Sequence, residues 1–113
     1  MPRFKFPKND EKYSWTNHVG RKMMFYGLSA DRIKRVMRNP KRSEKGIAEG
    51  TIAVMQPAGT KTRPYEVWVM YVQKPTKKLI ITAWRYPGVS PIREAIPIPA
   101  DIIAELKKEG IFK

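Results

Sequence analysis

Residues 65–86 constrain the fold most, because they hold two runs rich in valine, isoleucine, tyrosine and tryptophan. β-branched and aromatic side chains favour a pleated, half-buried surface. Residues 73–77 separate the two runs, and Pro75 among them cannot sit in a central ladder because proline lacks a backbone N–H. The pattern therefore predicts two antiparallel strands joined by a short turn.

The register of this hairpin follows from its turn. If Gln73 pairs with Lys78, Glu66 stands opposite Arg85. Both faces of the hairpin are then largely apolar, which predicts a sheet covered on both sides over most of its length. The polar exceptions gather at one end of the hairpin, and they are Tyr65, Glu66, Arg85 and Tyr86. We therefore expect the chemistry at this end.

Two helices are predicted ahead of the hairpin. Ser14 can cap a helix that runs to about Tyr26, and Gly27 is placed to end it in a left-handed turn. Ser29 can cap a second helix. The Asn39-Pro40 step ends this second helix, because the residue before a proline is pushed out of the helical region.

The remaining segments complete an α+β domain. A first sheet strand is predicted within residues 46–56, bulged at Gly50, and a short C-terminal helix over about residues 100–109. Residues 1–13 are predicted to form a basic arm, with an N-terminal edge strand as the alternative. We thus expect a single domain over residues 1–113 with two N-terminal helices, a three-stranded antiparallel sheet and a terminal helix.

Charge points to the class of partner. The 23 lysine and arginine residues exceed the ten acidic residues by 13, and residues 1–48 alone carry a net +9. Such an excess favours polyanionic partners. Nucleic acid is the first candidate, and anionic lipid is the second, because no strongly basic amphipathic anchor helix is evident.

Basic residues are densest within residues 32–45, where seven occur with Asp31 and Glu44 as the only acids nearby. Arg32, Arg35 and Arg38 recur at a spacing of three along the outer side of the second predicted helix. A charge run is often only a solvated face, but the net charge favours an anion-binding face here. The predicted nucleic-acid-binding residues are Arg21, Lys22, Arg32, Arg35, Arg38, Lys41, Arg42 and Lys45.

The sequence lacks the residues that disulfides, zinc sites, membrane spans and phosphate-binding loops require. The chain has no cysteine and one histidine, which argues against disulfides and a zinc site and fits a reducing, cytoplasmic setting. It shows no signal peptide, no run of about 18 apolar residues and no glycine-rich phosphate loop. We therefore expect no membrane association, no metal and no cofactor.

A basic helical pair ahead of a three-stranded meander resembles the RelE-like toxin superfamily. The resemblance is strongest to a branch of small, mostly uncharacterised domains related to the BrnT toxins, and it covers roughly residues 14–86. Residues 87–113 follow this core as a proline-rich segment and the terminal helix. The residues that carry the likeness are His18, then Arg21 or Lys22, then Gly27-Leu28-Ser29, Asn39-Pro40 and Lys41-Arg42.

The resemblance implies a function. Members with a known role are bacterial or archaeal toxins of toxin–antitoxin pairs that cleave RNA, some of them on the ribosome. It therefore implies a metal-independent endoribonuclease acting on RNA, including ribosome-bound mRNA, with an acidic antitoxin as protein partner. It places catalytic groups at Arg85, Tyr86 and Glu66. The chain departs from the family in lacking a histidine near its C-terminus, which several RNA-cleaving members have.

Cleavage of RNA without metal needs a base for the 2′-hydroxyl, a cation for the charge on phosphorus and a proton for the leaving oxygen. His18 or Glu66 could act as the base, Arg85 or Arg42 could bind the phosphate, and Tyr86 could stack on a nucleobase or pass a proton. Each group also has a structural alternative: a helical histidine that holds a neighbour, a Glu66–Arg85 cross-strand ion pair, and a tyrosine in the core.

Three functional hypotheses follow from the sequence. The first is a RelE-like ribonuclease toxin that uses His18, Glu66, Arg85 and Tyr86. The second is a non-catalytic RNA- or ribosome-binding module with the same fold. The third is a structural protein whose basic face binds only an acidic protein.

Overall fold

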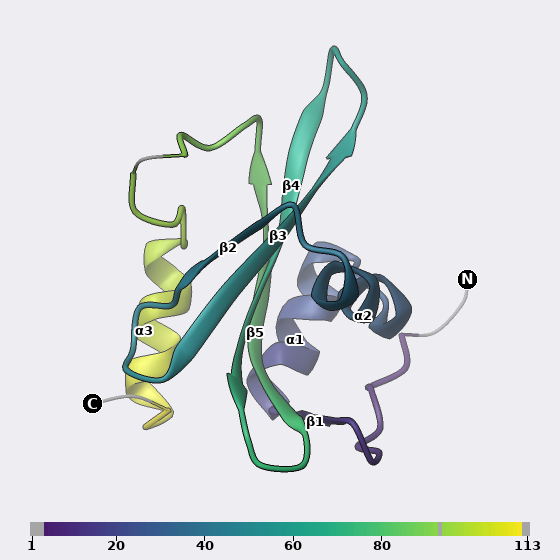
Figure 1. Ribbon diagram of the computed structural model, residues 1–113, viewed down its shortest axis with the longest axis vertical. Helices are drawn as coiled ribbons and strands as arrows, with labels where there is room; N and C mark the ends of the chain where they lie inside the picture. The colour runs from purple at the N-terminus through teal and green to yellow at the C-terminus, as the bar shows by residue number, and fades with distance from the viewer. Residues whose placement is uncertain (1–3, 93, 112–113) are drawn as a thin grey trace.

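A computed structural model describes residues 4–92 and 94–111 of the chain (Figure 1). Its elements, in chain order, are β1 (Tyr13–Trp15), α1 (Asn17–Tyr26), α2 (Ala30–Arg38), β2 (Arg42–Lys45), β3 (Thr51–Gly59), β4 (Pro64–Gln73), β5 (Lys78–Pro87) and α3 (Ala100–Lys108). No helix among the described residues is long and apolar enough to cross a bilayer.

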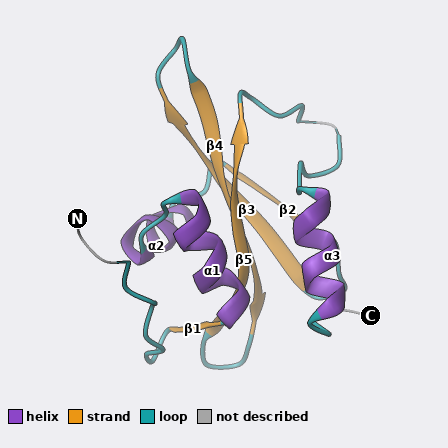
Figure 2. Ribbon diagram, turned by 180° about the vertical axis from the view of Figure 1, so that it is seen from behind, coloured by secondary structure: helices purple, strands orange, loops and turns teal. Residues whose placement is uncertain are grey.

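The five strands form one mixed sheet in the order β1-β5-β4-β3-β2. β1 runs parallel to β5, and every other neighbouring pair is antiparallel. Helices α1 and α2 lie on one side of the sheet and α3 on the other (Figure 2). The protein is therefore an α+β structure of three layers, with the sheet in the middle.

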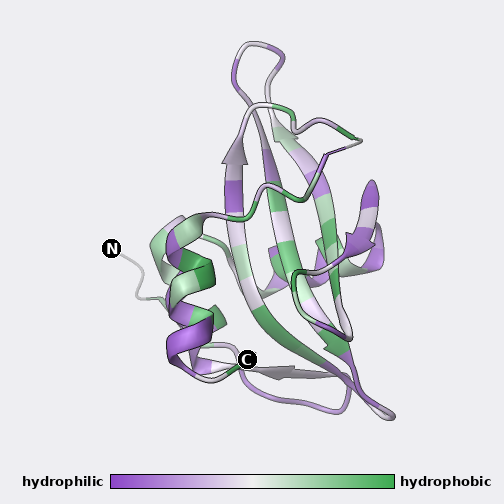
Figure 3. Cartoon of the chain, turned by 90° about the vertical axis from the view of Figure 1, so that its left-hand side faces the viewer, coloured by the Kyte–Doolittle hydropathy of each residue, from purple (hydrophilic) through white to green (hydrophobic). Residues whose placement is uncertain are grey.

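Each face of the sheet has its own hydrophobic core. Between the sheet and the two N-terminal helices, Val19, Met23, Ile33 and Val36 pack against strand residues such as Val69. Hydrophobic residues run along the strands of the sheet (Figure 3). This confirms the prediction of a sheet covered on both sides, which the apolar character of both hairpin faces required.

The second core lies between the sheet and α3. Ile102 and Leu106 of α3 are fully buried there. Trp68 and Trp84 stack with ring centroids 5.8 Å apart and an interplanar angle of 1°. The predicted terminal helix is confirmed, and this apolar contact is what holds it against the sheet.

The predicted helices are largely confirmed, with one correction at the start of α1. Thr16, not Ser14, caps the helix, and its hydroxyl accepts a hydrogen bond from the Val19 N–H at 3.0 Å. Ser14 instead lies in β1, because the chain adds a short parallel strand beside β5 before it turns into the helix. Gly27 ends α1 in the predicted left-handed conformation, and Ser29 caps α2 as predicted.

The predicted sheet was wrong in its number of strands, since three antiparallel strands were expected and five mixed strands are present. The additional strand β2 comes from the basic run and pairs with β3 over four residues. The N-terminal edge strand is Tyr13–Trp15, whereas Phe4 and Phe6 of the predicted arm are not in a strand. Arg3 of that arm lies outside the described residues. Gly50 has a φ of 80° in the turn before β3 and is not a strand bulge.

The hairpin register was correct only near its turn. Gln73 pairs with Lys78 as predicted, but Ile81 has no partner on β4, so the register shifts by one residue beyond it. Glu66 therefore lies opposite Tyr86, and Arg85 lies opposite Val67. A β-bulge of this kind places one extra residue in one strand and exchanges the faces of all residues beyond it. The predicted Glu66–Arg85 pair is consequently absent.

Candidate nucleic-acid interface

The exposed side of α2 carries a row of basic residues that continues into the following turn. Ile33 and Val36 bury the inner side of the helix, so the opposite side faces outward. We call the four outward residues the basic ridge, and they are Arg32, Arg35, Arg38 and Lys41. Among the described residues, none of the four has a carboxylate within 4.0 Å. The ridge therefore presents uncompensated positive charge.

The ridge stands on a well-anchored helix. The side-chain amide of Gln56, on β3, donates hydrogen bonds to the carbonyl oxygens of Arg35 and Asn39 at 3.2 and 2.8 Å. The Lys41 N–H donates to the Met55 carbonyl at 2.8 Å. The basic residues of the last helical turn also lie at the negative end of the helix dipole, which favours them there. The backbone that carries the basic residues is thus held at a fixed place against the sheet.

The other predicted nucleic-acid-binding residues divide into two groups. Arg21 pairs with Glu109, Lys22 is buried and pairs with Glu105, and Arg42 pairs with Glu44. These three side chains are engaged within the protein. Lys45 is exposed at the end of β2 and, in the described part of the chain, has no carboxylate within the same distance.

A pocket of about 270 Å³ adjoins the end of the ridge, and Lys41 lines it. The pocket lies where the end of β3, the start of β4 and the segment after β5 come together. Its apolar lining includes Met55, Pro57 and Val89. Arg42, Glu66 and Ser90 provide its polar lining.

Arg42 joins β2 to the segment after β5. Its Nε donates to Glu44 at 2.6 Å, and Nη1 donates to the Ser90 hydroxyl at 2.9 Å. Nη2 donates to the carbonyl oxygens of Ile92 and Glu94, both at 3.2 Å. The guanidinium carbon Cζ lies over the Trp68 ring, 5.2 Å from its centroid. This buried arginine therefore holds the segment after β5 in place, and its guanidinium is not free to bind a phosphate.

Glu66 holds the same segment from the sheet. Its carboxylate accepts hydrogen bonds from the Ser90 hydroxyl at 2.6 Å, from the Ser90 N–H at 3.1 Å and from the Trp68 indole at 2.9 Å. Glu66 is 2% exposed. All three contacts are structural, so the carboxylate that was predicted as a base is engaged in fixing Ser90.

The four predicted catalytic residues do not come together. Arg85 lies on the α1 side of the sheet, with its guanidinium 4.8 Å from the centroid of the Tyr65 ring. Tyr86 packs into the core on the α3 side, across the strand pair from Glu66. No hydrogen bond or ion pair among the described residues joins any two of His18, Glu66, Arg85 and Tyr86. The four side chains therefore do not surround one site, because Glu66 and Arg85 lie on opposite faces of the sheet.

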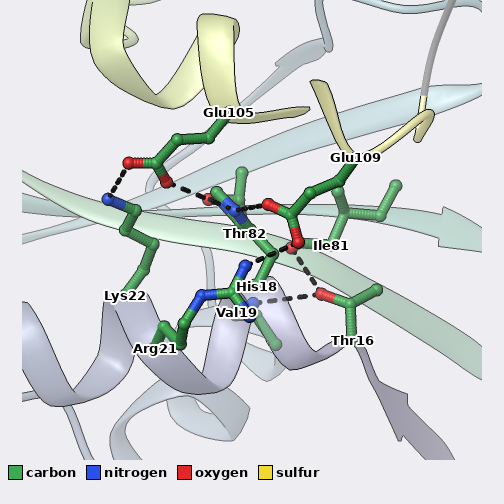
Figure 4. A network of polar contacts seen from close by, with 9 residues as sticks. All are labelled: Thr16, His18, Val19, Arg21, Lys22, Ile81, Thr82, Glu105 and Glu109. Carbon is green, nitrogen blue, oxygen red and sulfur yellow. Dashed lines mark hydrogen bonds and ion pairs between the residues drawn. The ribbon is translucent and has the colours of Figure 1, made fainter. Parts of the chain in front are cut away.

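His18 belongs to a separate network between α1, β5 and α3 (Figure 4). Its Nε2 lies 2.9 Å from the Thr82 hydroxyl, and its Nδ1 lies 3.0 Å from a carboxylate oxygen of Glu109. Arg21 pairs with Glu109, the residue that follows α3, and Lys22 pairs with Glu105 within α3. We call this group the α1–α3 clasp, because it ties the C-terminal helix to the first helix past the edge of β5.

Burial sets the protonation of the clasp. Desolvation lowers the pKa of His18 below its ordinary value of 6.5, and the neighbouring carboxylates of Glu109 and Glu105 oppose this only in part. The Arg21 guanidinium is the largest influence that lowers the pKa of Glu109. The neutral imidazole and the ionised carboxylate are therefore the favoured forms at neutral pH.

The clasp also contains a set of groups within reach of one metal ion. Ligand atoms of His18, Glu105 and Glu109 lie within 4.8 Å of one another. Arg21 and Lys22 already hold the two carboxylates, however, and their charges oppose a divalent cation. The arrangement fits an internal ion-pair network better than a metal centre.

Sequence reasoning missed Ser90, Thr82, Glu105 and Glu109. The only local signal was the end of the last helix, where Glu105 and Glu109 lie on one face at a spacing of four. Their partners on α1 lie more than 80 residues away in the chain, beyond the reach of any spacing rule. Comparison with protein-family models, curated proteins and solved structures gives no match for the chain. The RelE-like relationship therefore stays a prediction.

Proposed function

We propose that this protein is a non-catalytic module that binds single-stranded RNA through the basic ridge. The observation that carries the proposal is a row of four cations on the outer side of one helix and its following turn, none of which has a carboxylate of a described residue within 4.0 Å. A net charge of +13 supports the same partner, since it accelerates association with any polyanion.

The geometry of the ridge favours a phosphate backbone over a membrane surface. Arg32, Arg35 and Arg38 follow one another at a spacing of three, so successive residues advance about 4.5 Å along the helix axis. Guanidinium groups bind phosphate through paired N–H donors. α2 buries its apolar side in the protein core, so it offers no apolar face to lipid. A flexible single strand can adjust its phosphates to such a short row.

The structure favours binding over catalysis. RNA cleavage needs the base, the cation and the proton donor around one phosphate. Here His18 pairs with Thr82 and Glu109, and Glu66 with Ser90, while Arg85 lies on the opposite side of the sheet from Glu66. The endoribonuclease hypothesis rests on the family resemblance, whereas the binding module rests on the ridge.

The test is a titration of short, fluorescein-labelled single-stranded RNA at several salt concentrations. Each phosphate contact on a single strand contributes about 0.7 to the slope of log affinity against log salt, so four contacts give a slope of about −2.8. The ridge variant changes Arg32, Arg35, Arg38 and Lys41 to Ala. We expect it to bind weakly and to lose most of the slope.

A matched control removes the same amount of charge elsewhere. It changes four exposed lysines outside the ridge to Ala, and they are Lys12, Lys74, Lys107 and Lys108. We expect this control to keep most of the affinity and of the slope. Equal losses in both variants would show a response to net charge alone and would contradict a ridge-specific site. Metal-independent cutting of the RNA during the titration would restore the ribonuclease hypothesis.

A further inference from the structure

Hydrogen bonds to the sheet hold the segment after β5, which forms one wall of the pocket beside the ridge. Ser90 is pinned by Glu66 through two hydrogen bonds and by Arg42 through a third. The Gly88 N–H donates to the Pro64 carbonyl at 2.9 Å, and Gly88 has a φ of 87°, which allows the sharp turn after β5. The segment that closes the pocket is thus held in place before any ligand arrives.

The chemistry of the pocket suits a flat, mostly apolar group. Met55, Pro57 and Val89 line it, and Val89 is 74% exposed at its rim. A volume of about 270 Å³ is slightly below the usual range for small-molecule pockets, which begins at about 300 Å³. A pocket of this size accepts one ring system rather than a large ligand.

Arg42 and the aromatic side chain of Tyr65 both line the pocket. The Nε, Nη1 and Nη2 atoms of Arg42 all donate in the plane of the guanidinium. The Cζ atom of Arg42 also lies over the Trp68 ring, so the arginine already takes part in one stacking contact beside the pocket. Unstacked nucleobases of single strands stack on aromatic side chains and on arginine planes.

We propose that the pocket receives one unstacked nucleobase of the RNA strand whose phosphates lie on the basic ridge. The inference rests on the proposed function, because it takes the strand to be held by the ridge. Lys41 makes the connection, since it ends the ridge and also lines the pocket. A strand held there places a base within reach of the opening, and the adjoining positive charge favours this ligand over an apolar side chain of another protein.

The test compares two labelled strands with the same number of phosphates. One is a short single-stranded RNA, and the other is a ribose-phosphate spacer strand that has no bases. Base stacking changes affinity by about 5- to 150-fold per base. We expect the RNA to bind the wild-type protein more tightly by a factor in this range, with a similar salt slope for both strands.

Two variants at one exposed position test where the base goes. Pro57 lines the pocket and is exposed, so both variants should fold. Pro57→Met places a long, adaptable side chain in the opening, whereas Pro57→Ala leaves the pocket open. We expect Pro57→Met to abolish the preference for the strand with bases and to keep the salt slope. Pro57→Ala should keep both the preference for the strand with bases and the salt slope.

The outcomes separate this inference from the proposed function. Absence of binding by both strands would contradict the RNA-binding proposal itself. Equal binding of the two strands by the wild-type protein would leave RNA binding intact and overturn the base pocket. An unchanged preference in Pro57→Met would place base stacking elsewhere on the protein and would equally overturn it.

Discussion

Removal of the imidazole from the α1–α3 clasp should destabilise the fold through a single buried hydroxyl. Thr82 is fully buried, and its only hydrogen-bond partner among the described residues is His18 Nε2. His18→Leu fills much of the same space but cannot form this bond. The hydroxyl then loses its partner without gaining water, which costs about 1–3 kcal/mol. Glu109 adds little to the loss, because it is partly exposed and keeps Arg21.

A double-mutant cycle tests this explanation by also removing the Thr82 hydroxyl that His18→Leu leaves without a partner. In His18→Leu/Thr82→Val both polar partners become apolar, a replacement that is close to neutral when shape is kept. We therefore expect the double variant to recover most of the stability lost in His18→Leu, with a coupling free energy of about 0.5–3 kcal/mol. Thr76→Val makes the same chemical change at an exposed turn position and should leave stability almost unchanged.

The same cycle predicts a pH dependence. The pKa of His18 is lowered by folding, so below its ordinary value of 6.5 the unfolded chain binds a proton that the folded protein resists. The stabilisation is fully present above pH 6.5 and is lost as pH falls toward the folded pKa. The slope contributed by one group is at most about 1.4 kcal/mol per pH unit. It should vanish in His18→Leu/Thr82→Val.

Urea unfolding followed by tryptophan fluorescence at several pH values measures both quantities. The acid loss that remains in the double variant should begin near pH 4.5, where Glu109 of the unfolded chain takes up a proton that the lowered pKa of Glu109 in the folded protein resists. The reasoning would be refuted if Thr82→Val failed to rescue His18→Leu. An unchanged slope below pH 6.5 in the double variant would refute the assignment of that slope to His18.

Two further predictions concern other buried contacts. Glu66→Gln should lower the free energy of unfolding by about 1–3 kcal/mol, because one amide oxygen cannot accept all three hydrogen bonds from Ser90 and Trp68. Urea titration measures this change, and unchanged stability would contradict the structural role of the carboxylate. Gly20→Ala should release the N-terminal arm, because an added Cβ would overlap the Phe6 ring. Limited proteolysis should then cut the arm faster, and an unchanged rate would contradict the packing of Phe6 on α1.

Much of the fold was predictable from signals that act within a few residues. The Gly27 ending of α1, the Ser29 cap of α2 and the turn at Gln73 and Lys78 all rest on local hydrogen bonds and backbone preferences. The terminal helix was predicted over about residues 100–109, and α3 spans Ala100–Lys108. The apolar character of both hairpin faces also predicted a sheet that is covered on both sides.

The number of strands and the register of the hairpin could not be predicted from such local features. β2 is a short, highly charged segment that becomes a strand only because β3 offers it an edge to pair with. β1 is likewise defined by its pairing with β5. The unpaired Ile81 reverses the side on which Arg85 lies, and no local feature of the sequence marks a bulge there.

The amino-acid sequence by itself determined the chain's positive charge, its two central strands and the basic row of α2. Only the tertiary structure decided which polar side chains meet. His18 and Glu109 stand 91 residues apart and touch because α1 and α3 flank the same strand. Arg42 and Ser90 meet across 48 residues to build one wall of the pocket. Such pairs depend on how the helices pack on the sheet, and the spacing of residues along the chain does not predict that packing.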